Sequence, residues 1–167
     1  MSTQVAVNTH SHSVTYVTDK LLGSVKEIVR LSGLDPDKLG DDWEVLERGI
    51  LTWLNDEHLE VVHLEVYHAT TDKLVGRWDF DIFYNYSSGD GSFWQDPDDI
   101  KYHIRKQNLD PANCSYRVVT TTTPGRRYVS GWSGTSLRST DGFVRQGIGT
   151  TINGGGLSAG AGYWRKK

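Results

Sequence analysis

The sequence contains few of the features that would indicate a secreted or membrane-bound protein. Among its 167 residues there is one cysteine, Cys114, so no intramolecular disulfide can form and a reducing compartment such as the cytoplasm is expected. No uninterrupted apolar run exceeds three residues, which is far too short for a membrane-spanning helix. The N-terminal stretch MSTQVAVNTHSHS lacks the apolar segment of a signal peptide. We therefore expect one domain, long enough to bury a core.

The sequence also lacks a complete catalytic motif. Gly154, Gly156 and Ala159 have the spacing of a dinucleotide-binding loop, but no acidic residue follows and too little chain remains for a βαβ unit. No glycine precedes the Lys-Ser/Thr pair of a phosphate-binding loop. Ser133 lies in a stretch that resembles a nucleophile elbow, yet Thr135 occupies the position of the last glycine. We expect neither catalytic residues nor a cofactor.

One group of side chains allows a metal-binding alternative. Asp79 and Asp81 are predicted to share one face of a strand, and His63 and Glu65 could lie opposite them on a neighbouring strand. Four such groups can bind a divalent cation, which would suit a metal-dependent hydrolase. A solvated strand face with alternating charges explains the same pattern. We favour the solvated face and expect no metal site.

Apolar periodicity predicts three helices. The first begins at a cap, Ser13, ends at Gly33, and carries a stripe every three or four residues: Val14, Val17, Leu21, Val25, Ile28 and Leu31. The second begins at a capping box made by Asp41 and Glu44, and its stripe is Trp43, Leu46, Ile50, Trp53 and Leu54. The third begins at Asp96-Pro97, with aspartates in its first turn.

The period changes to two between the second and third helices. HLEVVHLEVYH and KLVGRWDFDIFYN flank the turn ATTD, which predicts a β-hairpin with one buried face, and the loop YSSGDGSFW follows. The β-branched stretch Cys114–Thr123 predicts a further strand. The order of elements indicates an α+β fold, with helices packed on one face of a mainly antiparallel sheet.

The C-terminal segment, residues 126–167, differs from the rest of the chain. It holds seven cations and one anion, so it carries +6 while the remaining 125 residues carry −9. Most of the 18 glycines lie in or next to this segment. We divide the single domain into a mobile tail (1–12), a core (13–125) and this basic segment (126–167). Trp94, Trp132 and Trp164 are predicted to lie in glycine-rich loops, where they could anchor a partner or cover the core.

Two functions account for the basic segment. In the first, its cations and interleaved aromatics bind nucleic acid, although the acidic body would repel a polyanion. In the second, the segment docks on that acidic body through short β-capable pieces joined by glycine hinges, and traps an extended peptide at a sheet edge. A fully disordered tail is disfavoured because the segment contains too many apolar residues.

The chain resembles the bacterial HORMA-domain proteins that are encoded beside cGAS/DncV-like nucleotidyltransferases in anti-phage (CBASS) operons. The resemblance covers nearly the whole chain and is carried by the order of elements together with a set of motifs: SVTYVTDKLLGSVKEIVRLSGLDPD, TDKLVGRWDFDI, GDGSFW, PGR, GWS, RSTDG and AGYWR. It implies a HORMA core and a C-terminal safety belt, here residues 126–167, which wraps around a closure-motif peptide and locks it against the sheet.

The resemblance also implies partners and the absence of catalysis. The closed, peptide-bound form would bind and activate the neighbouring nucleotidyltransferase, which then makes a cyclic oligonucleotide. A TRIP-type AAA+ ATPase would engage the mobile N-terminus, here residues 1–12, and reopen the domain. The protein would act as a cytoplasmic peptide sensor without enzymatic activity.

From this resemblance we expect particular residues at the peptide and the belt. The peptide should add as a strand beside Cys114–Thr123 or the belt, near a lining of Tyr116, Val118, Thr120 and Trp132. Tyr163 and Trp164 would be the latch that fastens the end of the belt to the body. The remaining candidates, which either hold the belt, contact an acidic partner or only solubilise the surface, are Arg117, Arg138 and Arg145.

Overall fold

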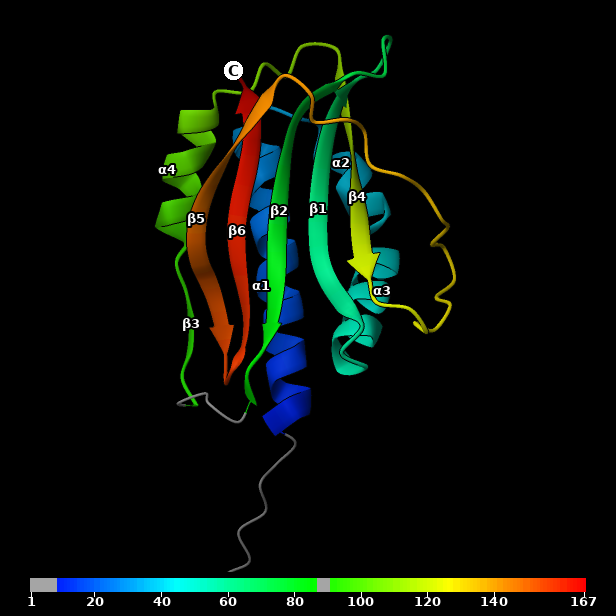
Figure 1. Cartoon of the computed structure of the whole chain (residues 1–167), viewed down its shortest axis with the longest axis vertical. Coiled ribbons are helices and arrows are strands. Elements are labelled where there is room, and N and C mark those ends of the chain that lie inside the picture. The colour runs from blue at the N-terminus through cyan, green and yellow to red at the C-terminus, as the bar shows by residue number, and fades with distance from the viewer. Residues whose placement is uncertain (1–8, 87–90) are drawn as a thin grey trace, which may run out of the picture.

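A six-stranded antiparallel sheet with helices on one face forms the protein (Figure 1). The computed structural model describes residues 9–86 and 91–167. The helices are α1 (Thr9–Leu31), α2 (Asp37–Asp41), α3 (Trp43–Asn55) and α4 (Pro97–Gln107). The strands are β1 (Leu59–His68), β2 (Leu74–Tyr84), β3 (Phe93–Gln95), β4 (Cys114–Thr122), β5 (Phe143–Gly154) and β6 (Leu157–Lys166). Their order in the sheet is β3-β5-β6-β2-β1-β4, which confirms the predicted α+β architecture.

Helix α1 lies behind the sheet and supplies much of the core (Figure 1). Its predicted stripe is buried except for Leu31, which is 43% exposed. The predicted start is wrong, because the helix begins at Thr9 and Ser13 is buried inside it. Residues 1–8 of the predicted tail lie outside the described residues. Within residues 9–86 and 91–167, every helix is too short or too polar to span a lipid bilayer.

The starts of the other helices test the predicted caps. The prediction of a capping box made by Asp41 and Glu44 is wrong. Asp42 takes the cap position of α3 and makes no side-chain cap hydrogen bond. The predicted cap of α4 is confirmed, because the Asp96 carboxylate accepts a hydrogen bond from the Asp99 backbone N–H. Pro97 follows at the first helical position, where its missing N–H costs nothing.

Strands β1 and β2 form the predicted hairpin, which lies between β6 and the edge strand β4. The apolar pairs Val62–Phe80 and Leu64–Trp78 are fully buried against the helices. The opposite face was predicted to be solvated, and this is wrong: Glu65 is 0% exposed there. This face is covered by arginine and tryptophan side chains from distant parts of the chain, described below, which an alternating pattern does not reveal.

The C-terminal segment completes the sheet. Strand β6 pairs with β2, so that Tyr163 stands opposite Trp78 and Trp164 opposite Arg77. Trp94 and Trp164 therefore lie in strands rather than in the predicted loops, whereas Trp132 lies in a loop. The predicted loop YSSGDGSFW ends in strand β3, and its residues 87–90 are outside the described part of the chain.

The glycines that join β5 and β6 form a tight turn. Gly154 pairs with Leu157, which leaves Gly155 and Gly156 as the two connecting residues, with φ of +64° and +102°. Positive φ at both central residues is the requirement of the two-residue hairpin turn that matches strand twist. A side chain at position 156 would also meet backbone, because its Cβ would lie 2.6 Å from the Asn85 carbonyl oxygen.

Gly156→Ala should therefore destabilise the protein for two reasons. The new Cβ would clash with the Asn85 backbone, and alanine is strained at the positive φ of this position. We expect a loss of roughly 1–3 kcal/mol in the free energy of unfolding, measured by chemical denaturation. The control is Gly134→Ala, since nothing lies within 4 Å of a Cβ at that position and its φ is not positive. Equal stability of the two variants would show that this turn does not need glycine.

Candidate functional site

Strand β4 forms one edge of the sheet. Its inner side pairs with β1, and within residues 9–86 and 91–167 no strand pairs with its outer side. In this register, Tyr116 and Val118 stand opposite Val66 and Leu64, so their side chains share the face of the sheet that carries the helices. Arg117 stands opposite Glu65 on the other face. A free edge of this kind offers backbone hydrogen-bonding groups to another extended chain.

The chain between β4 and β5 passes around this edge; we call residues 123–142 the crossing segment. Figure 1 shows it standing away from β4 before it returns in front of the sheet towards β5. On the helix side it is fastened to α3. The Trp53 indole N–H donates to the Arg127 carbonyl at 2.8 Å, and the Trp132 indole N–H donates to the Val45 carbonyl at 2.9 Å. We call this contact the rear anchor.

The rear anchor depends on a glycine in α3. Trp132 packs edge-on against Trp53, with ring centroids 4.9 Å apart. A Cβ at Gly49 would lie 2.3 Å from the Trp132 Nε1, so the ring occupies the space that a side chain would fill. Helical periodicity treats Gly49 only as a weak point of the helix. The residue that explains it lies far along the chain, so sequence reasoning missed this role.

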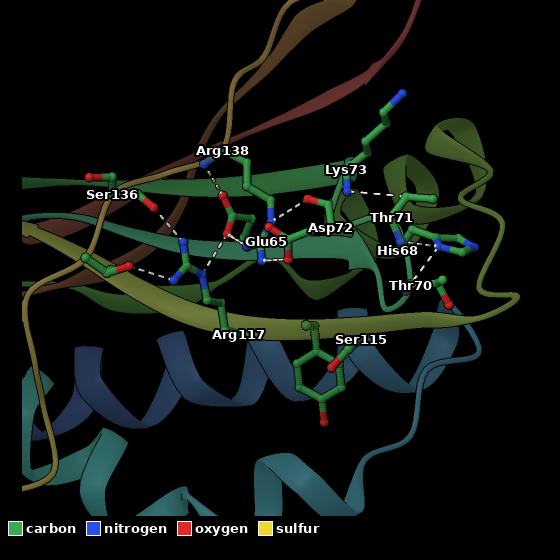
Figure 2. A network of polar contacts seen from close by, with 12 residues as sticks. Glu65, His68, Thr70, Thr71, Asp72, Lys73, Ser115, Arg117, Ser136 and Arg138 are labelled. Carbon is green, nitrogen blue, oxygen red and sulfur yellow. Dashed lines mark hydrogen bonds and ion pairs between the residues drawn. The ribbon is translucent and has the colours of Figure 1, made fainter.

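A buried carboxylate fastens the crossing segment on the opposite face of the sheet (Figure 2). Glu65 accepts hydrogen bonds from the Arg117 Nε at 2.7 Å and from the Arg138 Nη1 at 2.5 Å, and also from the Arg138 backbone N–H. Arg117 donates further to Thr135 and Ser136, and Arg138 pairs with Asp72 at 2.6 Å. We call this network the front anchor.

The charge on Glu65 is compensated within the front anchor. Burial by itself would raise the pKa of its carboxyl, but the hydrogen bonds from Arg138 and Arg117 outweigh burial and hold the pKa below its usual value. The carboxylate is therefore ionised at neutral pH. Removal of the Arg138 side chain would leave the buried carboxylate with Arg117 as its single arginine partner. An incompletely compensated buried charge strongly destabilises the folded protein.

A second polar network joins β6 to the centre of the sheet. Asp79 accepts hydrogen bonds from His63 at 2.6 Å, from Arg77 at 2.9 Å and from the Trp164 indole N–H at 2.9 Å. Burial raises the pKa of Asp79, but these hydrogen bonds dominate and lower it from 3.8 to about 2. Arg145 of β5 reaches the same region, 3.4 Å from Asp81. The side chains of this second network thus fasten β5 and β6 onto β2.

The side chains that the predicted metal-binding alternative required are engaged in hydrogen bonds and ion pairs. His63 and Asp79 bond to each other, and Glu65 is occupied by two arginines. In the described part of the chain, no three His, Cys, Asp or Glu side chains are grouped as metal ligands. Cys114 is half-buried at the start of β4.

A hollow of about 410 Å³ lies between α2, α3, β4 and the crossing segment. Of the four residues predicted to line a peptide site, Tyr116, Val118 and Trp132 line this hollow, whereas Thr120 does not. The two predicted latch residues lie elsewhere, in β6: Tyr163 is buried against Trp78. The three predicted arginines take part in the front anchor and in the second network.

Gly49→Ala should loosen the rear anchor, because the new methyl group displaces the Trp132 ring. We expect lower stability and faster proteolytic cleavage within residues 123–142. The matched control is Gly23→Ala, at a helical position with nothing within 4 Å of its Cβ, which should stabilise the protein by up to about 1 kcal/mol. Stabilisation by both substitutions, without faster cleavage, would contradict the rear anchor.

The Asp79 network should make stability depend on acid pH. Because the folded pKa is lowered, its contribution of about 2 kcal/mol is present above pH 3.8 and is lost as pH falls from 3.8 to about 2. Asp79→Asn should lower stability at pH 7 and flatten this part of the profile of unfolding free energy against pH. The control Asp141→Asn, at an exposed position, should leave the profile unchanged. An unaltered slope in Asp79→Asn would contradict the assignment.

Comparisons with known proteins identify the fold. The family model described as bacterial HORMA domain 2 matches residues 2–167. No curated protein matches the chain significantly by sequence. A chain of the crystal structure of the mitotic checkpoint complex is similar over 93% of this chain and 99% of its own length, with 10% identity and a TM-score of 0.71.

Two further solved structures share the fold. C. elegans HTP-2 bound to the HIM-3 closure motif has 13% identity and a TM-score of 0.61, and covers 86% of this chain and 85% of its own. A chain of the E. coli MS115-1 CdnC:HORMA-deltaN complex has 12% identity and a TM-score of 0.63, and covers 100% and 94%. At these identities the likeness is one of fold. Because the family model spans nearly the entire sequence, the chain belongs to the bacterial HORMA domain 2 family and has the HORMA fold.

Proposed function

We propose that the protein is a peptide-binding switch, in which an extended peptide adds as a strand to the outer edge of β4 and is held there by the crossing segment. One observation carries this proposal: the crossing segment passes around an edge of β4 with which no described strand pairs, and it is anchored on both faces of the sheet. Strand addition supplies main-chain hydrogen bonds, and side-chain pockets beside the strand supply specificity.

The free edge is limited at one end. The Lys38 ammonium of α2 donates to the Tyr116 carbonyl at 2.6 Å and to the Ser115 hydroxyl at 3.2 Å. Lysine side chains are a common protection of sheet edges against unwanted pairing. The position of Lys38 therefore favours a peptide that pairs with the part of β4 after Tyr116, between the two anchors.

The two anchors explain how a bound peptide would be retained. Both ends of the crossing segment are tied into the sheet, one through β4 and the other through β5 and β6. A peptide beneath it leaves only after one anchor opens or after it slides out along the strand. We propose that the structure corresponds to the closed form of the belt, and that binding affinity is set chiefly by the dissociation rate.

The latch residues have a related role in this proposal. Tyr163 stacks on Trp78 and shares a hydrogen bond with His103, while Trp164 donates to Asp79. These contacts hold β6 beside β2. We propose that they keep the end of the belt in the sheet while the crossing segment opens and closes.

The nucleic-acid alternative is less well supported, because the structure uses most cations of the basic segment internally. Arg127 pairs with Asp56, Arg138 with Glu65 and Asp72, and Arg145 with Asp81. Arg126 lies over the Trp53 ring. Phosphate binding draws its affinity from cations that are available to release counterions. Engaged arginines supply that affinity poorly.

We propose further that the closed, peptide-bound form binds and activates a cGAS-like nucleotidyltransferase in bacterial anti-phage signalling, in the cytoplasm. The family assignment and the E. coli relative that was solved as a CdnC:HORMA complex support this step. A TRIP-type AAA+ ATPase that engages residues 1–12 would reopen the belt. In this proposal the protein acts by binding and has no catalytic site of its own.

Peptides selected from a random display library provide the test. Loss of charge in Glu65→Gln removes the partner of both arginines, so the bound peptide should dissociate roughly tenfold faster or more. Dissociation of a fluorescent peptide measures this rate, and Arg105→Ala, an exposed position on α4, is the control.

Two outcomes would overturn the proposal. One is the failure of the folded wild-type protein to select any peptide. The other is a peptide affinity that falls steeply with salt, together with displacement of the peptide by competing nucleic acid. This result would support nucleic-acid binding by the basic segment. Binding by strand addition should depend only weakly on salt.

A further inference from the structure

The hollow beside β4 points to the chemistry of the ligand, an inference that rests on the proposed function. Its walls combine apolar side chains of three elements with one ring of the crossing segment. The apolar and aromatic wall residues are Leu39, Val45, Leu46, Tyr116, Val118 and Trp132. The remaining lining residues are Lys38, Asp42, Arg117 and Gly131.

The polar atoms of the aromatic walls are already satisfied. The Trp132 indole N–H donates to the Val45 carbonyl at 2.9 Å. The Tyr116 hydroxyl donates to the Asp35 carbonyl at 2.5 Å and accepts from the Leu39 backbone N–H at 3.0 Å. A polar side chain entering between these rings would lose water without gaining a hydrogen bond from them, which is unfavourable. An apolar side chain would gain from burial.

The geometry of strand addition directs a ligand side chain into this space. Val118 lies on the helix-side face of β4 and lines the hollow. Side chains of neighbouring strands project to the same face at paired positions, and successive residues alternate between faces. A peptide residue opposite Val118 therefore points into the hollow, while its two neighbours point to the other face.

We propose that this hollow selects peptides that carry one bulky apolar side chain, aromatic or large aliphatic, at the position opposite Val118. Charge contributes little to this selection, because Lys38 and Asp42 bring opposite signs to the rim and Arg117 is neutralised by Glu65. The hollow is therefore a specificity site for a single anchor residue of the ligand.

The same side chain also couples ligand binding to belt closure. Trp132 belongs to the crossing segment, yet it forms one wall of the hollow and packs on Trp53 of α3. A bulky ligand side chain fills the space between Trp132 and Val118, so it adds contacts to the rear anchor. A ligand with a small residue at this position adds no contacts to the rear anchor. The crossing segment then opens more readily than with a bulky ligand side chain in place.

The first part of the test is the selected motif. Peptides selected by the wild-type protein should share a bulky apolar residue at one position, with no common charge beside it. Replacement of that residue by alanine should weaken binding on the order of 100-fold, the effect of exposing a large apolar side chain. It should also speed up proteolytic cleavage of the crossing segment in the complex.

The second part changes the size of the hollow. Val118→Phe fills it and should shift the selected residue towards alanine or glycine, whereas Val45→Ala enlarges it and should favour tryptophan. Val144→Ala, at an exposed position on β5, is the control and should select the wild-type motif. Thermal unfolding identifies any variant that does not fold; because the two hollow variants act in opposite directions, either one suffices for the test.

The outcomes separate this inference from the proposed function. Selection of no peptide by the folded wild-type protein would overturn both. Selection of peptides without a common bulky residue, or a motif unchanged in the folded hollow variants, would overturn the inference alone and leave peptide binding intact.

Discussion

The attachment of the crossing segment to the front of the sheet depends on one buried carboxylate. Glu65 lies on β1, next to the edge strand β4, on the face of the sheet opposite the described helices, and is fully buried. A charge in that position requires compensation. Arg117 of the edge strand and Arg138 of the crossing segment supply it, because the chain after β4 returns across the sheet towards β5. The ion pairs to Glu65 thus fix the crossing segment to the sheet after it has passed around the edge of β4.

The crossing segment is held by two kinds of interaction that respond differently to conditions. The rear anchor is aromatic: Trp132 fills the space above Gly49 and packs on Trp53. The front anchor is electrostatic and depends on the ionisation of Glu65. A partner that competes for Arg138 would release the front while the rear stays closed. Packing at the hollow would strengthen the rear while the front stays unchanged. In the proposed switch, the crossing segment would therefore respond to two separate inputs.

The sequence predicted the parts of the structure that local patterns determine. The apolar stripes of α1 and α3, the β1–β2 hairpin and the cap at Asp96 depend on near neighbours, and the structure has them. The assignment to HORMA proteins came from a resemblance spread over the whole chain, and the family model confirms it. The pairing of the C-terminal segment with β2 could not be predicted from periodicity, because strand partners are chosen by tertiary packing.

The candidate site was predicted only in part, because its main features link distant residues. An alternating pattern predicts one buried face, but the opposite face of β1 is also buried, and the arginines that cover Glu65 come from β4 and the crossing segment. Helical periodicity alone predicts only that Gly49 weakens α3, because its partner Trp132 lies far along the chain. Tyr116, Val118 and Trp132, which the resemblance predicts to line a peptide site, do line one hollow. Their role in peptide binding stays a prediction.

The measurement that tests the central claim most directly is peptide release after the belt is cut. A recognition sequence for a specific protease can be inserted at Gly134, where the crossing segment is exposed and nothing lies within 4 Å of a Cβ. The uncut protein is first loaded with a selected fluorescent peptide, and the protease is then added. If the crossing segment retains the peptide, cleavage should release it at a greatly increased rate while the sheet stays folded. A dissociation rate that is the same before and after cleavage would contradict the account.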